Sequence, residues 1–309
     1  MRIVSLLGSG TDLVIALGAG AELVGRSHEC DAPEVAHLPE LSRPTFPTTG
    51  SSAEIDRLVR QKLRAGEPLY AVDEAALAAL APDVVITQTH CEVCAVGAGA
   101  VCASPGGRLS RERVVAFRGG TLAGVLEDFR AVAQVIGRAE AGQRLDRTLR
   151  AERDAWLPRL AGRARPRVLC LEWIEPAFSM GNWGPELVAL AGGEALLAEA
   201  GAPSRAVPWE RIVSADPDVL VVAPCAFRLS RARDEMPVLA AQPGFSALRA
   251  VRAGRVFVAD GNRYFNRSSP GLFGTVQLLA ELLHPDHGAA APSRLAGRSY
   301  ERWPSASMI

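Results

Sequence analysis

Short apolar runs alternate with amphipathic stretches along the chain, which is the pattern of strands alternating with helices in a parallel sheet. In the first half, this pattern predicts strands over residues 2–7, 22–26 and 83–87, and helices over residues 11–17, 53–63 and 73–80. Thr11 or Asp12 can cap the first helix, and Gly18 ends it. The other residues between 32 and 72 are rich in Pro, Thr and Ser and are expected to be irregular. The chain is therefore expected to be an α/β protein.

The same order of elements returns in the second half. A predicted strand over residues 167–171 is followed by a helix over about residues 185–191. In each half, a helix ends just before Pro-Asp and an apolar strand follows, at Pro82-Asp83 and at Pro217-Asp218. We interpret the repeat as two similar lobes, each with a central, mostly parallel sheet flanked by helices.

The segment between the two halves has apolar residues at helical spacing, from Leu122 through Phe129 to Ile136. If the helix continues past Gly137 and Gly142, about forty residues at 1.5 Å each make a rod of about 60 Å. We expect an N-terminal lobe over residues 1–120, one long bridging helix over 121–161, a C-terminal lobe over 162–285 and a flexible tail over 286–309. A rigid helical link predicts small relative motions of the lobes.

Composition and charge exclude several classes of protein. The 309 residues include 34 Lys plus Arg and 34 Asp plus Glu, which removes the basic surface expected of a nucleic-acid binder. No apolar stretch is long enough to span a bilayer, so the protein is not expected to be membrane-embedded. The first apolar run stops at Gly8, which predicts no signal peptide and a cytoplasmic location. A chain trimmed of its signal would look the same, and its location would then be periplasmic or on the cell surface.

Ligands of open parallel sheets bind beyond the carboxyl ends of the strands, and this rule applied to both lobes points to one cleft. The expected ligand-binding residues follow the predicted strands: Ser9, Gly10, His28, Glu29, Cys91, Glu92, Glu172, Trp173, Asn182, Trp183, Arg228, Tyr264, Phe265 and Asn266. Ser9 and Gly10 either offer backbone N–H groups to an anion or form only a tight turn. The two tryptophans either cover a flat ligand or plug the lobe interface.

Two cysteines form the sharpest chemical motif, Cys91-x-x-Cys94. Such a loop can hold zinc or an iron–sulfur cluster, exchange thiols, or serve as a structural or ligand-contacting loop. A closed zinc site needs four ligands, and the remaining candidates are Cys102, Cys225, Cys30 and His28. Cys170 lies inside an apolar strand and is expected to fill the core.

An enzyme is one rival hypothesis, with Glu29, Glu92 and Glu172 as carboxylates facing one cleft. The other rival is a metal-binding or metal-sensing protein that uses the cysteines. The sequence contains no nucleophile elbow, phosphate loop or dinucleotide fingerprint. We therefore expect a binding protein without catalytic residues.

Several segments resemble the cobalamin-binding receptors of ABC importers. The opening reads RIVSLLGSGTDLV from residue 2, and later segments read PRV from 166, PAF from 176 and RYFNRSSP from 263. The resemblance covers about residues 1–285, within a wider group of helical-backbone receptors for metals, haem, siderophores and corrinoids. A signal-less branch is most similar, through RSHECD from residue 26 and CEVCAV from residue 91.

The resemblance implies that the ligand is a cobalamin or a related corrinoid or macrocycle, held in the cleft of a cytoplasmic carrier or scavenger. It also implies that His28 can coordinate a corrinoid cobalt. Receptors of this family dock to an ABC permease through one acidic residue on each lobe. Glu210 matches in the second lobe, whereas Ala75 stands at the matching position of the first, beside Glu74. A receptor whose signal was removed remains the alternative.

Overall fold

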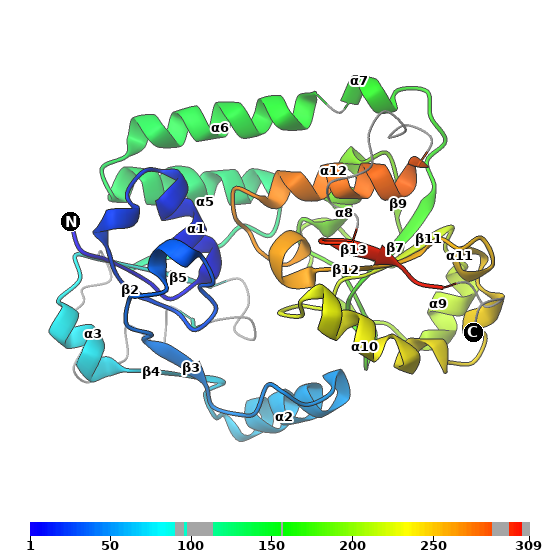
Figure 1. The fold of residues 1–309 in the computed structure, drawn as a ribbon, viewed down its shortest axis with the longest axis horizontal. Coiled ribbons are helices and arrows are strands. Elements are labelled where there is room, and N and C mark those ends of the chain that lie inside the picture. The colour runs from blue at the N-terminus through cyan, green and yellow to red at the C-terminus, as the bar shows by residue number, and fades with distance from the viewer. Residues whose placement is uncertain (90–95, 98–113, 156, 286–296, 305–309) are drawn as a thin grey trace. The chain divides into compact units, whose positions relative to one another are not determined.

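The computed structural model describes residues 1–89, 96–97, 114–155, 157–285 and 297–304. The chain forms two compact units that are not contiguous in sequence. Unit 1 comprises Met1–Gly50, Arg57–Arg150 and Ser268–Pro270, and unit 2 comprises Ser51–Asp56, Ala151–Arg267 and Gly271–Ile309. The predicted α/β architecture of two similar lobes is confirmed (Figure 1).

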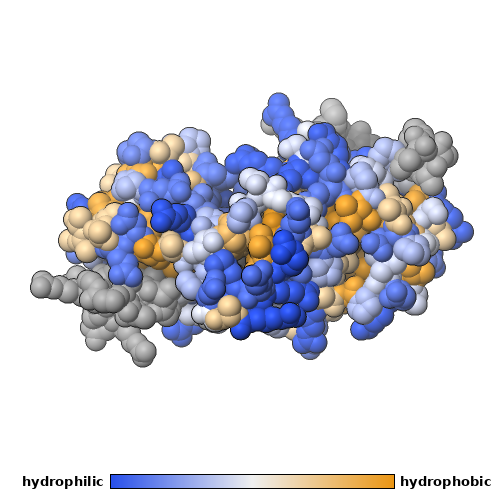
Figure 2. Space-filling model, turned by 90° about the horizontal axis from the view of Figure 1, so that it is seen from below, coloured by the Kyte–Doolittle hydropathy of each residue, from blue (hydrophilic) through white to orange (hydrophobic). Residues whose placement is uncertain are grey.

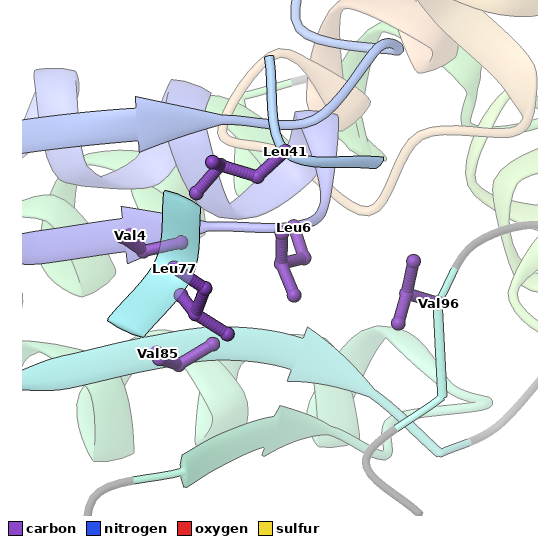
Figure 3. Close-up of a cluster of buried hydrophobic side chains, with 6 residues drawn as sticks. All are labelled: Val4, Leu6, Leu41, Leu77, Val85 and Val96. Atoms are coloured by element: carbon purple, nitrogen blue, oxygen red, sulfur yellow. The ribbon is translucent and has the colours of Figure 1, made fainter. Parts of the chain in front are cut away.

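Unit 1 is built on a parallel sheet with strand order β2-β1-β5-β6. Its strands are β1 (Ile3–Ser5), β2 (Leu23–Arg26), β5 (Val84–Gln88) and β6 (Val114–Phe117). The helices include α1 (Gly8–Ala16), α3 (Glu74–Leu80) and α5 (Leu122–Val135). Buried aliphatic side chains from β1, α3 and β5 pack together with others from intervening loops: Val4, Leu6, Leu41, Leu77, Val85 and Val96 (Figure 3). Both faces of such a sheet are covered, which explains why its strands read as continuous apolar runs.

Unit 2 repeats this frame as β9-β7-β11-β12, again with all neighbours parallel. The strands are β7 (Arg167–Trp173), β9 (Glu194–Ala195), β11 (Val219–Val222) and β12 (Val256–Ala259). Antiparallel strands extend the sheet, namely β8 (Phe178–Ser179), β10 (Arg205–Ala206) and β13 (Tyr300–Arg302). The helices are α8 (Gly184–Leu190), α9 (Trp209–Ala215), α10 (Leu229–Ala240), α11 (Arg249–Arg252) and α12 (Leu272–Leu283).

The repeated Pro-Asp pair has the same structural role in both units. The Asp83 carboxylate accepts a hydrogen bond from the Arg2 amide at 2.8 Å, and Asp218 accepts one from the Arg167 amide at 2.8 Å. Each aspartate therefore fastens the start of the unit's first strand beside the strand that follows the Pro-Asp pair. The preceding helices end alike, because Ala81 and Asp216 both adopt left-handed backbone with φ near 40°. The sequence echo is thus confirmed as a repeat of the fold.

The segment predicted as one bridging rod is helical but not continuous. It consists of α5, α6 (Ala139–Asp154) and α7 (Leu157–Leu160), and α5 and α6 run side by side (Figure 1). Gly137 breaks the helix with φ +68°, a conformation that glycine adopts without steric cost. An ion pair between Arg130 and Asp146 at 3.1 Å joins α5 to α6. The expectation of a straight helix through Gly137 was therefore wrong, whereas Gly142 does lie inside a helix.

Three local predictions also need correction. The region expected to be a flexible tail contains β13, which pairs with β12 in the unit 2 sheet. Helix α1 begins at Gly8, so Thr11 and Asp12 lie inside it and do not cap it. The region expected to be irregular contains a short antiparallel pair, β3 (Ser42–Pro44) and β4 (Tyr70–Val72), next to the predicted helix α2 (Ser52–Ala65).

The surface on the face seen in Figure 2 is mostly hydrophilic, with hydrophobic side chains in separate small patches. Among the described residues, no helix is long and apolar enough to cross a membrane.

Candidate functional site

The loops that follow β7 and β11 meet at the carboxyl edge of the unit 2 sheet. The amide of Cys225 donates a hydrogen bond to the carbonyl of Glu172 at 2.9 Å. The half-buried ring of Trp173 packs edge-on against Phe227, with 5.2 Å between the ring centroids. Two predicted ligand-binding residues, Glu172 and Trp173, thus lie beside the loop that carries the predicted Arg228.

The loop after β12 joins the same edge through a π-helical turn, Gly261–Phe265. The amide of Asn262 donates to the carbonyl of Phe227 at 3.2 Å, and the Asn266 side chain donates to the carbonyl of Ala223 at 3.0 Å. Gly261 is required here, because a Cβ atom at this position would collide with the Pro224 carbonyl. Short π-helical segments recur at functional sites, and this one brings the predicted Tyr264, Phe265 and Asn266 to the loop after β11.

Tyr264 is held in place from both ends. Its hydroxyl accepts a hydrogen bond from the Ser299 hydroxyl at 2.9 Å, and Thr275 donates to its carbonyl at 2.5 Å. The Arg263 guanidinium lies 5.7 Å from the centre of its ring. The ring is half-buried, so part of its surface stays open to a ligand.

Trp173 also fastens the first turn of α2, which belongs to unit 2. Its indole N–H donates to the carbonyl of Ser52 at 3.2 Å. Both carboxylate oxygens of Glu235, on α10, accept from the Ser52 amide at 3.0 Å. Ser52 is buried, and its hydroxyl has no hydrogen-bond partner. The Trp173 ring is thus fixed by its polar edge, while its plane is set by Phe227.

Trp183 is a core residue, contrary to the prediction that its ring contacts ligand. It is 4% exposed, and its indole N–H donates to the carbonyl of Phe265 at 3.0 Å. Phe265 itself is fully buried, so it too supports the loop and offers no surface to a ligand. Asn182 takes left-handed backbone with φ +49°, and its amide donates to Ala202 at 2.6 Å. Trp173, the last residue of β7, therefore lies at the sheet edge, whereas Trp183 in the following loop packs in the interior.

In unit 1, His28 follows β2 in a mostly buried site. Its Nδ1 lies 3.0 Å from the Ser42 hydroxyl, and its ring centroid lies 5.4 Å from that of Tyr70. Its Nε2 lies 3.6 Å from the Glu29 carboxylate and is buried, with no hydrogen-bond partner among the described residues. Burial lowers the pKa of His28, while the charge of Glu40 and a hydrogen bond with Ser42 act in the opposite direction. The imidazole is therefore neutral near pH 7 and retains a lone pair on one nitrogen.

Ser9 and Gly10 lie in the first turn of α1 and are buried. A Cβ atom at residue 10 would meet Ile86 Cγ2 at 2.7 Å, so close packing explains the glycine. The Ser9 hydroxyl accepts a hydrogen bond from Ser268 at 3.4 Å. These contacts favour the reading in which the Gly-Ser-Gly run packs a helix tightly onto the sheet.

The predicted cysteine motif and its neighbours lie outside the described residues, namely Cys91, Glu92, Cys94 and Cys102. The metal or redox site there stays a prediction. In the part of the chain that the structure describes, no group of three or more His, Cys, Asp and Glu could hold a metal ion. Cys30 is buried with its sulfur 3.0 Å from the Thr11 hydroxyl. Burial raises the pKa of Cys170 to about 12, as expected of a core thiol.

The predicted docking residue Glu210 is exposed in the first turn of α9. The register of α9 against α3 is fixed by two equivalences: the buried Ile212 matches the buried Leu77, and both helices end in the left-handed cap described above. By this register, the counterpart of Glu210 is Ala75, which is also exposed. The first turn of α3 therefore carries its exposed carboxylate one residue earlier, at Glu74, which one step along a helix turns by about 100° away from the position of Glu210.

A separate pocket of about 400 Å³ lies beside the start of α9. Its lining includes Asp56, Glu175, Pro208 and Trp209. None of the residues predicted to bind ligand lines this pocket, but its lining includes Ala53 and Ile174, which directly follow Ser52 and Trp173 in the chain.

Sequence reasoning missed Arg231, whose guanidinium carbon lies 3.7 Å from the centre of the Phe227 ring. A signal was present, because the aromatic Phe227 in the loop after β11 is followed by arginines one and four positions later, at 228 and 231.

Comparison with known proteins bears on both fold and function. The family model described as "Periplasmic binding protein" matches residues 3–262. A periplasmic heme-binding protein from Pseudomonas aeruginosa is 19% identical with a TM-score of 0.69, and the match covers 92% of each chain. The periplasmic vitamin B12 binding protein BtuF of Vibrio cholerae is 18% identical with a TM-score of 0.62, over 92% of this chain and 96% of that one.

A third similar structure is a periplasmic heme-binding protein from Roseiflexus sp. RS-1, 22% identical with a TM-score of 0.66, over 93% of this chain and 98% of the other. At these identities the likeness shows a shared fold. No curated protein matches the chain.

Proposed function

The chain belongs to the periplasmic binding protein family and is a ligand-binding protein of the kind that serves ABC transporters, and we propose that its ligand is a cobalamin or a related corrinoid or macrocycle. Family membership accounts for the lack of catalytic motifs, because such proteins bind and do not catalyse. The fold is shared with structures whose names specify heme and vitamin B12, both of them tetrapyrrole-type macrocycles.

The observation that carries the proposal is the edge of unit 2, where three parallel strands end side by side. Trp173 and Tyr264 stand there, half-buried and held by hydrogen bonds at their polar atoms. Rigid aromatic side chains can cover a planar ligand at a low cost in conformational entropy. In unit 1, His28 is the proposed nitrogen donor to a central metal of the ligand, a role that requires its Nε2 atom, buried in this structure, to become exposed.

A macrocycle that buries several hundred Å² of apolar surface gains on the order of ten kcal/mol before association costs. This supports sub-micromolar binding if those costs are moderate. The expectation that the strand-end residues of both units line one cleft stays a prediction, because each unit is described by itself.

The test is an absorbance and fluorescence titration of the purified protein with cobalamin, cobinamide and hemin. We expect at least one of them to bind with micromolar or tighter affinity. Trp173→Ala should weaken that binding about tenfold, or roughly 1.4 kcal/mol. Trp173→Phe keeps a ring but loses the bond to Ser52, and so separates stacking from positioning. Trp209→Ala is the matched control, since its indole N–H bonds to Pro243 and its side chain lines the pocket beside α9 in place of the predicted ligand site. Absence of binding by all three ligands at high micromolar concentration would refute the proposal.

We further propose a cytoplasmic carrier or scavenger role, supported by the missing carboxylate at Ala75. A rim charge mainly speeds association, so its loss weakens docking to a permease without abolishing it. The exposed Glu210 favours the alternative of an importer receptor. Fractionation of native cells with an antibody to the untagged protein decides between them. Recovery from the periplasm or the outer face of the membrane would establish the receptor.

A further inference from the structure

Phe227 is the centre of a stacked group in the loop after β11. Its ring is 1% exposed, because Trp173 packs against its edge and Arg231 lies over its face. A guanidinium over an aromatic face is held in one plane by the ring's quadrupole. The stack therefore presents a flat indole and an oriented cation next to each other.

Two more arginines lie at the same place. Arg228 follows Phe227 in the chain and is exposed. Arg267 donates through Nη2 to the Asn262 side-chain oxygen at 3.4 Å, and the Asn262 amide binds the Phe227 carbonyl. Three guanidinium groups thus come from residues that adjoin or contact Phe227 and Asn262, at the carboxyl ends of β11 and β12.

The electrostatics of this arginine group favour an anion. Burial lowers the pKa of Arg231, and the charge of Glu235 acts in the opposite direction. The Glu235 carboxylate is itself bonded to the Ser52 amide. The first turn of α10, which begins directly after Arg228, contains no acidic residue and adds the positive end of its helix dipole. A partly desolvated cation gains most from a paired oxyanion.

We propose that Arg228, Arg231 and Arg267 bind an oxyanion at the periphery of the ligand, so that the protein prefers acidic macrocycles to neutral ones. A guanidinium carries five N–H donors in a planar fork, so contacts within the protein do not preclude bidentate binding of a carboxylate or phosphate. The Trp173 and Tyr264 rings then contact the apolar plane of the macrocycle, and the arginines bind the charged groups at its edge. The inference rests on the proposed macrocycle-binding function and names the charge class of its ligand.

Two pairs of ligands distinguish the source of the oxyanion. Hemin carries two carboxylates that its dimethyl ester lacks, and cobalamin carries a phosphodiester that cobinamide lacks. Titration of the full chain with all four compounds should show tighter binding, by about tenfold, of the acidic member in at least one pair. Which pair shows the preference identifies a carboxylate or a phosphate as the group recognised.

Variants connect the preference to the arginines. Arg231→Gln and Arg267→Gln should each weaken binding of the acidic member about tenfold and leave the neutral member within about twofold. Arg228→Gln removes an exposed charge and tests the site without changing the Arg231 stack on Phe227 or the Arg267 bond to Asn262. Arg233→Gln is the matched control, because Arg233 lies on the same helix but pairs with Glu301 and Asp234.

The outcomes separate this inference from the proposed function. Equal affinities within both pairs, or arginine variants that weaken acidic and neutral members alike, would overturn the anion site while macrocycle binding stands. If none of the four compounds binds, the proposed function fails, and the inference fails with it. A preference for the acid that disappears in the arginine variants but persists in Arg233→Gln supports the site.

Discussion

The two units share one strand order, yet the loops at their strand ends have different chemistry. In unit 1, residues after β2 contact polar side chains of neighbouring elements: His28 contacts Ser42 of β3, and Cys30 contacts Thr11 of α1. In unit 2, the residues after β7, β11 and β12 are rings and arginines that share a surface. The comparison teaches that the frame is specified by buried strands and their backbone bonds, whereas binding chemistry is added in the loops.

The largest expected effect separates core from surface in the unit 2 loops. Trp183→Ala removes a buried ring and its bond to Phe265, and should lower the free energy of unfolding of unit 2 by about 3–5 kcal/mol. Phe129→Ala is the counterpart in unit 1, where the ring is 2% exposed. Urea denaturation of the full chain, monitored with a spectroscopic probe in each unit, measures the loss of stability in both variants. Normal stability with weakened ligand binding in the Trp183 variant would return this ring to the ligand site.

Two glycines allow a comparison of how tightly the backbone is packed after a strand in each unit. Alanine at 261 places a Cβ against the Pro224 carbonyl, which cannot yield, so the cost should reach about 3 kcal/mol. Alanine at 10 meets the side chain of Ile86, which can shift, so about 1–2 kcal/mol is expected. Thermal unfolding of both variants checks the order. The reverse ranking would show that the π-helical turn is adaptable.

The paired aspartates provide the next test. Asp218→Asn should cost about 1–2 kcal/mol through a weakened bond to the Arg167 amide. Burial raises the pKa of Asp218, but bonds from Arg167 and Arg249 lower it by more, so it lies below its usual value. The contribution of Asp218 to the free energy of unfolding is therefore present above about pH 4 and is lost as pH falls through its pKa in the folded state.

Denaturation of wild type and Asp218→Asn across pH 2–7 should show the two curves converging at the acidic end. Asp83→Asn is the matched variant in unit 1. Asp83 accepts the equivalent bond from the Arg2 amide, whereas the bond from Arg249 belongs to Asp218. An equal loss of stability in both variants at neutral pH would mean that Arg249 adds nothing to the bond.

The smallest expected effect is a pH dependence confined to unit 1. Because burial lowers the pKa of His28, the unfolded state binds its proton first as pH falls below about 6.5. Stability is thus fully present above that pH and declines through the window down to the folded pKa. The groups facing His28 are Glu29, Glu40, Ser42 and Tyr70. Titration by NMR measures the pKa directly, and His28→Gln should flatten this part of the stability curve.

Much of this frame could be predicted from the sequence. The Pro-Asp repeat located β5 and β11, and counting back from the two pairs set Ala75 against Glu210. The helix break was missed because one glycine inside a helical pattern is tolerated in some helices and breaks others. Whether the helix breaks at Gly137 depends on the packing of α6 on α5, through contacts such as Arg130 with Asp146. The pair β3 and β4 was missed because three-residue strands carry almost no periodicity.

The site was predicted less completely, for a physical reason. Strand-end logic correctly placed Glu172, Trp173, Arg228 and Tyr264 on one sheet edge. It could not tell that Trp183 turns inward, because a tryptophan in a loop has the same sequence signal whether buried or exposed. Distinguishing the two requires knowing where the Phe265 carbonyl lies, which depends on a turn about eighty residues away in sequence.

The interleaving of the units has a consequence for how the protein is made. Unit 1 includes Ser268–Pro270, and unit 2 includes Ser51–Asp56. During synthesis, the first half of the chain emerges from the ribosome long before Ser268, the partner of Ser9, has been translated. Unit 1 must therefore wait for almost the whole chain before its last contacts form, while the first turn of α2 waits for α10 and Glu235. A nascent chain stalled before residue 268 should be more sensitive to protease in its first half than the released protein.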